Sequence, residues 1–220
     1  ANTLAILALA LESREQLHAL RARLNLEYQQ QFRGILHLFF ERRELARARP
    51  MSEWLTREGC ERTMKSAAEC LALEPALAQS TLPLVGGTYG PGDESGDAHA
   101  FVLALAQRAA DRGVRFRYGT SVARLHRRQG SVDGAVLSDG EVLSGDACVV
   151  ALGSYTPLLL RPLGISLPIY PVKGYSITLP LNAESLAPRV SLTDESRRLV
   201  FSRLGDRLRV AGTAELNGYD

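Results

Sequence analysis

The segment Asp146–Tyr155, Asp-Ala-Cys-Val-Val-Ala-Leu-Gly-Ser-Tyr, constrains the fold more than any other part of the chain. Its short, unbroken apolar run, Ala147–Leu152, is bounded by turn residues, which favours a strand buried on both faces, as in a parallel sheet. A helix is expected to start near Thr156 and Pro157. Ligands of open α/β sheets bind at the carboxyl ends of such strands, where glycine lets the backbone approach a ligand closely. The segment therefore predicts a binding edge at Gly153, with a plain tight turn as the structural alternative.

The composition is that of an ordinary soluble globular protein, with 45% hydrophobic and 23% charged residues. The formal net charge of +2 is too close to neutral to indicate a nucleic-acid partner. The three cysteines lack CxxC spacing and a matching histidine cluster, so no metal site is predicted, and the odd thiol count favours a reducing compartment. The apolar run Leu4–Leu11 has no basic segment before it and is too short to span a bilayer, so we interpret it as the buried first half of a helix.

The first half of the chain predicts helices that alternate with isolated strands. Ser66, with Glu69 at the capping-box position, predicts the start of a short helix, and Asp97 predicts the start of an amphipathic one. A proline interrupts a helical pattern, so a break is expected around Pro50. The predicted elements are a helix over 2–24, a strand over Gly34–Phe40, a helix over Glu41–Glu58, a short strand at Thr63–Met64 and a strand over Leu84–Tyr89, whose paired glycines require something to pack closely.

The second half predicts mostly strands. Val114–Tyr118 is expected to be a strand, followed by a three-stranded meander whose second turn, Ser138-Asp139-Gly140, is a strong hairpin signal. After Leu160 the extended segments predict an antiparallel sheet, joined by the strands Gly34–Phe40 and Leu84–Tyr89. These segments are Ile169–Pro180, Arg189–Leu192, Arg197–Leu204 and Arg207–Gly212.

Motifs on these elements give the chain a family resemblance. In order, they are GILHLFF, the segment Glu74-Pro75-Ala76-Leu77, GGTYGPGDESGD, GVRFRYGTSV, VVALGSYTPLLL, IYPVKGYSITLPL and RLRVAGTAELNGYD. The chain resembles the D-amino-acid oxidase-like flavoprotein superfamily and, within it, the FAD-dependent D-amino-acid dehydrogenases of bacteria. PVKGYS followed by RVAGTAE is fairly specific to that group, whereas ALGSYT occurs throughout the superfamily.

The resemblance implies a mixed α+β and α/β fold in three segments. Residues 1–95 are expected to form the first part of a substrate domain, helices plus two strands. Residues 96–160 would form a partial FAD-binding βα layer with the β-meander, and residues 161–220 the antiparallel second part of the substrate domain. Family members begin with a GxGxxG motif that binds pyrophosphate, and this sequence has none. We therefore expect an internal portion of a longer enzyme that binds FAD weakly or not at all and is inactive alone.

The resemblance also implies site residues. Val122 and the run Ala151, Leu152 and Gly153 would contact FAD, and no catalytic residue is assigned because the flavin itself takes the hydride. Candidates for substrate contact are His37, Tyr89, Lys173, Gly174, Tyr175, Arg203 and Arg209. Arg203 and Arg209, on neighbouring predicted strands, would supply a guanidinium fork for a carboxylate. Core packing, surface ion pairs and solvated arginines are the structural alternatives.

The implied activity is oxidation of a D-amino acid to an imino acid, which hydrolyses to a 2-oxo acid and ammonia, with electrons passing to a respiratory-chain acceptor. A non-catalytic binding or scaffold domain and a glycine or sarcosine oxidase-like enzyme are the alternatives. The resemblance places such a protein in the cytoplasm, with peripheral attachment of a longer parent to the inner membrane left open. The sequence predicts neither the oligomeric state nor the amino acid preferred.

Overall fold

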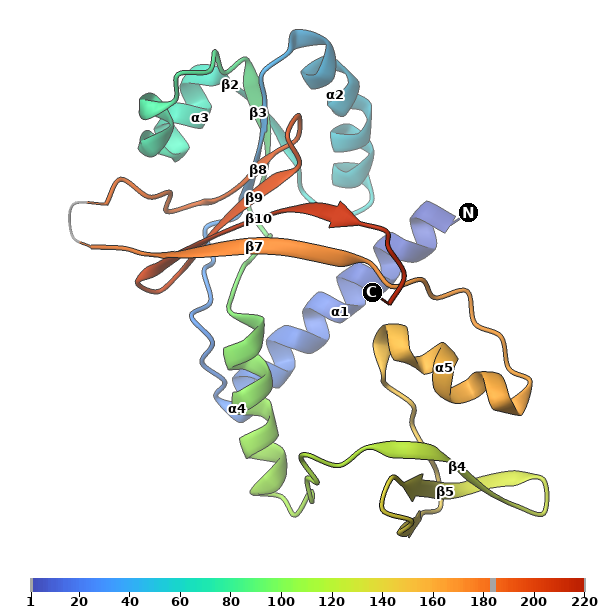
Figure 1. Cartoon of the computed structure of the whole chain (residues 1–220). Helices are drawn as coiled ribbons and strands as arrows, with labels where there is room; N and C mark the ends of the chain where they lie inside the picture. The colour runs from blue at the N-terminus through green and yellow to red at the C-terminus, as the bar shows by residue number, and fades with distance from the viewer. Residues whose placement is uncertain (1, 183–184, 220) are drawn as a thin grey trace. The chain divides into compact units, whose positions relative to one another are not determined.

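The computed structural model describes residues 2–182 and 185–219 and divides into two compact units (Figure 1). The first consists of Ala1–Gly113 and Gly174–Thr213, and the second of Val114–Lys173 and Ala214–Asp220. The assignment of residues 1–95, 96–160 and 161–220 to substrate and cofactor domains stays a prediction.

The first unit is built on a seven-stranded sheet with strand order β2-β3-β1-β8-β9-β10-β7. β1 pairs with β8 in parallel, whereas β1–β3, β2–β3, β8–β9 and β9–β10 are antiparallel, so the sheet expected to be antiparallel is mixed. Its strands are β1 (Ile35–Phe39), β2 (Thr63–Ser66), β3 (Gly86–Gly90), β7 (Lys173–Pro180), β8 (Ser191–Asp194), β9 (Leu199–Leu204) and β10 (Arg207–Glu215).

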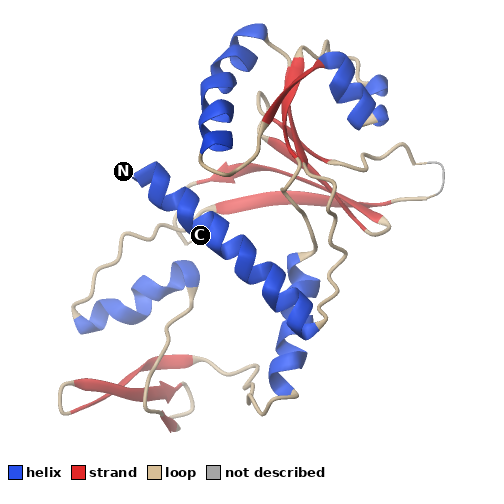
Figure 2. Cartoon of the chain, turned by 180° about the vertical axis from the view of Figure 1, so that it is seen from behind, coloured by secondary structure: helices blue, strands red, loops and turns tan. Residues whose placement is uncertain are grey.

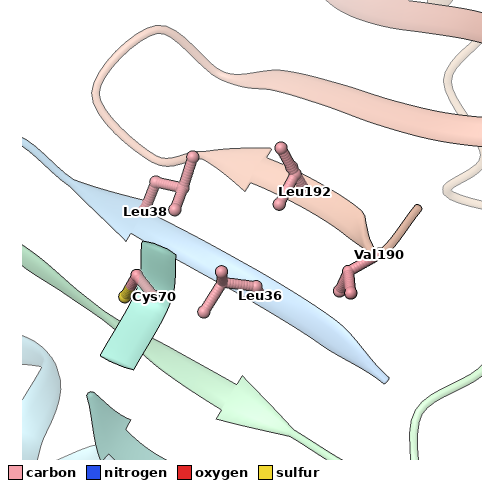
Figure 3. Close-up of a cluster of buried hydrophobic side chains, with 5 residues drawn as sticks. All are labelled: Leu36, Leu38, Cys70, Val190 and Leu192. Atoms are coloured by element: carbon pink, nitrogen blue, oxygen red, sulfur yellow. The ribbon is translucent and has the colours of Figure 1, made fainter. Parts of the chain in front are cut away.

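A small hydrophobic core lies on one face of this sheet, which we call the core face (Figure 3). Alternate residues of a strand share a face, so Leu36 and Leu38 of β1 point together, beside Leu192 of β8, which pairs with Leu36. Cys70 of α3 (Ala67–Leu73) and Val190 complete the cluster.

The glycines of β3 leave room for the two helices beside the sheet. A Cβ on Gly87 would lie 3.0 Å from Cys70 Sγ of α3 and 2.6 Å from the carbonyl oxygen of His37, and one on Gly86 would lie 2.9 Å from Leu45 of α2 (Arg42–Arg57). The helices α2 and α3 therefore pack on opposite sides of these strands (Figure 2). The prediction that other residues pack closely against the paired glycines is therefore confirmed.

Local capping signals are also confirmed. The Ser66 hydroxyl accepts a hydrogen bond from the Glu69 backbone N–H, and the Glu69 carboxylate accepts one from the Ser66 backbone N–H, which is the capping box of α3. Asp97 caps α4 (Ala98–Ala110) by accepting from the backbone N–H groups of His99 and Ala100. The other helices of this unit are α1 (Asn2–Leu24) and the 3₁₀ turn η1 (Pro75–Gln79).

Two expectations for the helices are wrong. The first half of α1 is not buried, because Leu4, Ile6 and Leu9 are 51%, 67% and 71% exposed. Its apolar residues are spread around the helix, so Ala and Leu propensity forms the helix without a buried face. The break at Pro50 is also absent, since α2 continues through it. Proline has a helix-compatible φ, so although it removes one N–H from the hydrogen-bond ladder and crowds the carbonyl group four residues before it, the turns on either side of it stay helical.

The second unit contains the predicted meander. β4 (Val122–Arg128), β5 (Ser131–Leu137) and β6 (Val142–Ser144) form a three-stranded antiparallel sheet. The short helix α5 (Thr156–Leu160), expected from the Gly-Ser turn, follows the 3₁₀ turn η2 (Gly153–Tyr155) and precedes η3 (Arg161–Leu163).

Two predicted strands of this unit are not formed. Neither Val114–Tyr118 nor Ala147–Leu152 adopts strand structure, and Val149, expected to be buried on both faces, is 92% exposed. A strand needs a neighbour to satisfy its backbone groups, and within residues 2–182 and 185–219 no strand pairs with either segment. Arg117 is instead held by a two-pronged contact with the Glu141 carboxylate, with both N–O distances at 2.7 Å.

Candidate functional site

The substrate candidates of the first unit are divided between the two faces of the sheet. Thr88 and Thr193 are the strand partners of His37, so the His37 side chain lies on the face opposite Leu36, which we call the open face. Tyr89 is the partner of Leu36 and lies on the core face. The structure therefore does not bring His37 and Tyr89 together.

His37 and Tyr89 each have a defined partner. His37 Nδ1 lies 2.6 Å from Glu195 Oε1, in the turn that follows β8. The Tyr89 hydroxyl donates a hydrogen bond to the carbonyl oxygen of Arg33 at 2.9 Å, and its ring packs against the core cluster. These contacts give Tyr89 a structural role and orient the His37 ring.

The two arginines expected to form a fork point away from each other. Arg203 of β9 pairs with Leu208, whereas Arg209 of β10 pairs with Ser202, so the two guanidinium groups leave the sheet on opposite faces. Arg209 lies on the open face, where its Nε donates to Thr178 Oγ1 at 3.2 Å. Arg203 lies on the core face and donates to the carbonyl oxygen of Gly205 at 3.2 Å. The prediction that Arg203 and Arg209 form a shared guanidinium fork for one carboxylate is therefore wrong.

Lys173, Gly174 and Tyr175 begin β7, the strand at one edge of the sheet. All eight residues of β7 are exposed, and Tyr175 is 51% exposed. Since Thr178 meets Arg209 on the open face, alternation places Gly174 on the same face and Lys173 and Tyr175 on the other. The open face thus carries His37, Gly174 and Arg209.

An ion pair anchors α4 beside this sheet. The Arg207 guanidinium at the start of β10 donates to the Asp97 carboxylate at 2.8 Å. The pKa of Asp97 is held below its usual value mainly by the backbone N–H of Ala100, with help from Arg207 and His99 and against the opposing effect of burial.

The cofactor candidates of the second unit lie on exposed backbone. Val122 opens β4 and is 42% exposed, and Leu152 is 45% exposed. Gly153 has φ +54°, which disfavours other residues, and the space around its Cα is open. Ala151 and Leu152 lie in the segment before η2 that has no described strand partner.

These residues fit contact with a planar, partly apolar group. Val122 and Leu152 supply exposed apolar side chains, and Gly153 leaves room for a ligand to approach the main chain.

Sequence reasoning missed a contact that supports this turn. The Tyr219 hydroxyl donates to the carbonyl oxygen of Ser154 at 2.6 Å, and its ring lies 5.7 Å from that of Tyr155. The sequence shows a tyrosine at position 219 but not its partner, because no local pattern links residues that are 65 positions apart.

A comparison with known proteins decides the family. The model of the FAD dependent oxidoreductases matches residues 1–220. The chain belongs to the FAD dependent oxidoreductase family. The resemblance to D-amino-acid oxidase-like flavoproteins and the expectation of FAD as the family's cofactor are thereby confirmed.

Curated relatives within the FAD dependent oxidoreductase family are close. The D-amino acid dehydrogenase of Dechloromonas aromatica (strain RCB) is 51% identical over 100% of this chain and 53% of that protein. The D-amino acid dehydrogenase of Methylobacterium sp. (strain 4-46) is 49% identical over 94% of this chain and 49% of that protein. The chain thus spans about half the length of these relatives.

Solved structures agree with the mixed fold of this oxidoreductase chain. Glycine oxidase from Bacillus cereus ATCC 14579 matches 97% of this chain and 58% of its own with a TM-score of 0.85 at 23% identity. Glycine oxidase from Geobacillus kaustophilus covers 97% of this chain and 57% of its own, with a TM-score of 0.83 at 26% identity.

The described residues offer neither a metal cluster nor a membrane-spanning helix. In 2–182 and 185–219, no group of three or more His, Cys, Asp or Glu side chains is placed to hold a metal ion. Over the same residues, no helix combines the length and apolar character needed to cross a bilayer.

Proposed function

We propose that this chain is part of an FAD-dependent enzyme that oxidises D-amino acids to 2-oxo acids and ammonia. The observation that carries the proposal is the 51% identity, over the whole chain, to a protein named D-amino acid dehydrogenase. The match covers the whole chain and therefore both units.

The second unit would contribute to cofactor binding. Val122, Ala151, Leu152 and Gly153 would contact the adenosine side of FAD through backbone and small apolar groups. When bound, FAD accepts a hydride from the α-carbon of a neutral amino acid, and the protein's task is to hold the substrate in position.

The first unit would contribute to substrate binding through its open face. Arg209 offers a guanidinium group to the substrate carboxylate. Gly174 of β7 has no side chain, so a substrate can lie against the backbone there. His37, fixed by Glu195, presents its second ring nitrogen as a polar contact. Tyr89, Lys173, Tyr175 and Arg203 lie on the other face and are not part of this proposal.

Electron transfer to a respiratory-chain acceptor, with peripheral attachment to the inner membrane from the cytoplasmic side, completes the proposal. The supporting observation is that the relatives are named dehydrogenases. A second candidate, a glycine oxidase-like enzyme, is favoured by the structural match at a TM-score of 0.85.

The test is an FAD titration of the purified chain, followed by visible absorption after gel filtration. We expect weak, saturable binding that Gly153→Val reduces by about tenfold, equivalent to about 1.4 kcal/mol. In a longer protein that contains this chain, D-alanine should bleach the bound flavin and reduce a dye, whereas L-alanine should not. Glycine-dependent peroxide formation would instead support the second candidate. If the longer protein neither binds FAD nor oxidises either amino acid, a scaffold role replaces the proposal.

A further inference from the structure

We propose that Arg33, Arg189 and Arg203 form a binding site for a small oxyanion that carries two or more negative charges. The three arginines and Gln31 line one hollow of about 300 Å³ in the first unit. The inference concerns a different ligand class from the amino acid and flavin, and it does not depend on the proposed function.

Sheet topology explains why these arginines meet. Arg33 precedes β1 and Arg189 precedes β8, and because these strands are parallel, their starting ends lie at the same end of the sheet. β9 runs antiparallel to β8, so Arg203, close to the end of β9, reaches the same place. Three positions far apart in the sequence therefore converge on one hollow.

The backbone around the hollow is held in place. Gln31 exchanges two backbone hydrogen bonds with Ser95, at 2.8 and 3.1 Å. The Arg33 carbonyl oxygen accepts from the Tyr89 hydroxyl, and the Arg189 backbone N–H donates to the Glu74 carboxylate at 2.6 Å. The backbone from which Arg33 and Arg189 extend is thus fixed, so no loop has to be ordered when a ligand binds.

The charges of this cluster are not neutralised within the described residues. No carboxylate there lies within 4.0 Å of a guanidinium nitrogen of Arg33, Arg189 or Arg203, although arginines elsewhere pair readily, such as Arg197 with Asp194. Three like charges around one hollow repel each other, and an anion bound between them would relieve that repulsion.

Glu74, which lies near Arg189, does not serve as the counter-charge. Glu74 is 2% exposed, and its two carboxylate oxygens already accept hydrogen bonds from the backbone N–H groups of Ala76, Arg189 and Val190. Arg203 donates through Nε to the Gly205 carbonyl oxygen, which leaves its two terminal nitrogens and the guanidinium groups of Arg33 and Arg189 to match phosphate and carboxylate oxygens in two-pronged contacts.

The size of the hollow selects small ligands. A volume of about 300 Å³ stands at the lower end of ligand sites, which suits a phosphate, a pyrophosphate or a small polycarboxylate. Phosphoryl and carboxylate compounds share the oxyanion chemistry that the arginines recognise, so the experiment separates them.

The experiment is isothermal titration of the chain with inorganic phosphate, pyrophosphate and citrate, each against sodium chloride at equal ionic strength. We expect saturable binding of at least one multivalent anion and none of chloride. Binding of pyrophosphate without citrate would assign phosphoryl ligands, and the reverse would assign polycarboxylates. The double variant R33A/R189A should weaken the affinity by about tenfold or more.

The matched control is the double variant R43A/R47A, which removes the same charge from positions of α2 that are exposed, as Arg33 and Arg189 are, but do not line the hollow. This double variant should change the affinity less than about twofold, because an arginine that does not contact the anion acts on it only through long-range attraction that salt screens. Equal weakening in both double variants, or no saturable binding by any of the three anions, would overturn the proposal. Circular dichroism of both variants, matched to the unsubstituted chain, excludes unfolding as the cause.

Discussion

Glu74 and Val190 are joined by a hydrogen bond across 116 residues of sequence, from the Val190 backbone N–H to Glu74 Oε2 at 2.9 Å. The same oxygen accepts from the Arg189 N–H at 2.6 Å, and the other oxygen accepts from the Ala76 N–H at 3.0 Å. One buried carboxylate therefore ties the segment after α3 to the start of β8, next to the hydrophobic core.

Removing this carboxylate should strongly destabilise the chain. Glu74→Ala leaves three N–H groups without their acceptor, and at about 1–3 kcal/mol for each unsatisfied group the free energy of unfolding should fall by about 3 kcal/mol or more. Glu74→Gln keeps one acceptor oxygen and should lose less. Urea denaturation measures both, with Glu15→Ala on the exposed side of α1 as control. A loss in Glu74→Ala no larger than in the control would contradict this role.

The cap of α4 should be worth a measurable amount. Asp97→Ala removes the acceptor of two backbone N–H groups and the partner of Arg207, so the free energy of unfolding should fall by about 1–2 kcal/mol. Asp97→Asn keeps a capping oxygen and should fall less. The same urea experiment compares them, and an equal loss in both variants would show that the ion pair, not the cap, dominates.

The Asp97 carboxylate should also make the stability of the chain depend on pH in the acid range. The pKa of Asp97 is lowered in the folded state, first by the Ala100 N–H, so its contribution to stability is present above the unfolded-state value of about 3.9 and is lost as the pH falls through the folded-state value. Between neutral pH and about pH 3, the denaturation midpoint should therefore fall more steeply in the unsubstituted chain than in Asp97→Asn. Parallel pH profiles would refute the assignment.

Close packing at β3 predicts intolerance of a single methyl group. Gly87→Ala places a Cβ against the His37 carbonyl oxygen and Cys70 Sγ, so the cost should be about 1–3 kcal/mol. Gly174→Ala, in the same sheet, meets nothing within 4 Å and should change stability by less than about 0.5 kcal/mol. Thermal denaturation of the two variants side by side gives the answer, and similar melting temperatures would disprove the packing argument.

The thiols should differ widely in reactivity. Burial, and secondarily the Glu69 charge, raise the pKa of the Cys70 thiol to about 11, whereas Cys148 is exposed. At a pH of about 8, a thiol reagent should modify Cys148 rapidly and Cys70 only on unfolding, because the thiolate is the reactive form. Mass spectrometry of timed digests identifies each site. Early modification of Cys70 in folded protein would show that the core opens.

Local signals in the sequence predicted local structure well. The Ser66–Glu69 capping box, the Asp97 cap and the Asp139-Gly140 hairpin each depend on neighbours within a few positions, and all are present. The strand expected over Ala147–Leu152 depends on a partner strand, which apolar sequence cannot supply by itself.

The sequence did not correctly predict those parts of the candidate site in which strand register decides which face of the sheet a side chain occupies. Arg203 and Arg209 were expected to act together, but a shift of one position in a strand moves a side chain to the other face, and neighbouring strands alone do not set that register. The parallel pairing of β1 with β8 was equally invisible, because it joins segments separated by most of the chain. The exposed turn at Gly153, by contrast, follows from its own glycine and was expected.

The pairing of β1 with β8 also sets an order of events on the ribosome. Glu195, the partner of His37, is synthesised 158 residues after it. At about 5–20 residues per second, this delay is roughly eight to thirty seconds. During that interval Leu36 and Leu38 have no Val190 or Leu192 to pack against, whereas the meander of the second unit needs only adjacent strands. The core of the first unit is therefore completed only after the strands of the meander have been synthesised, and until then Leu36 and Leu38 lack these two partners.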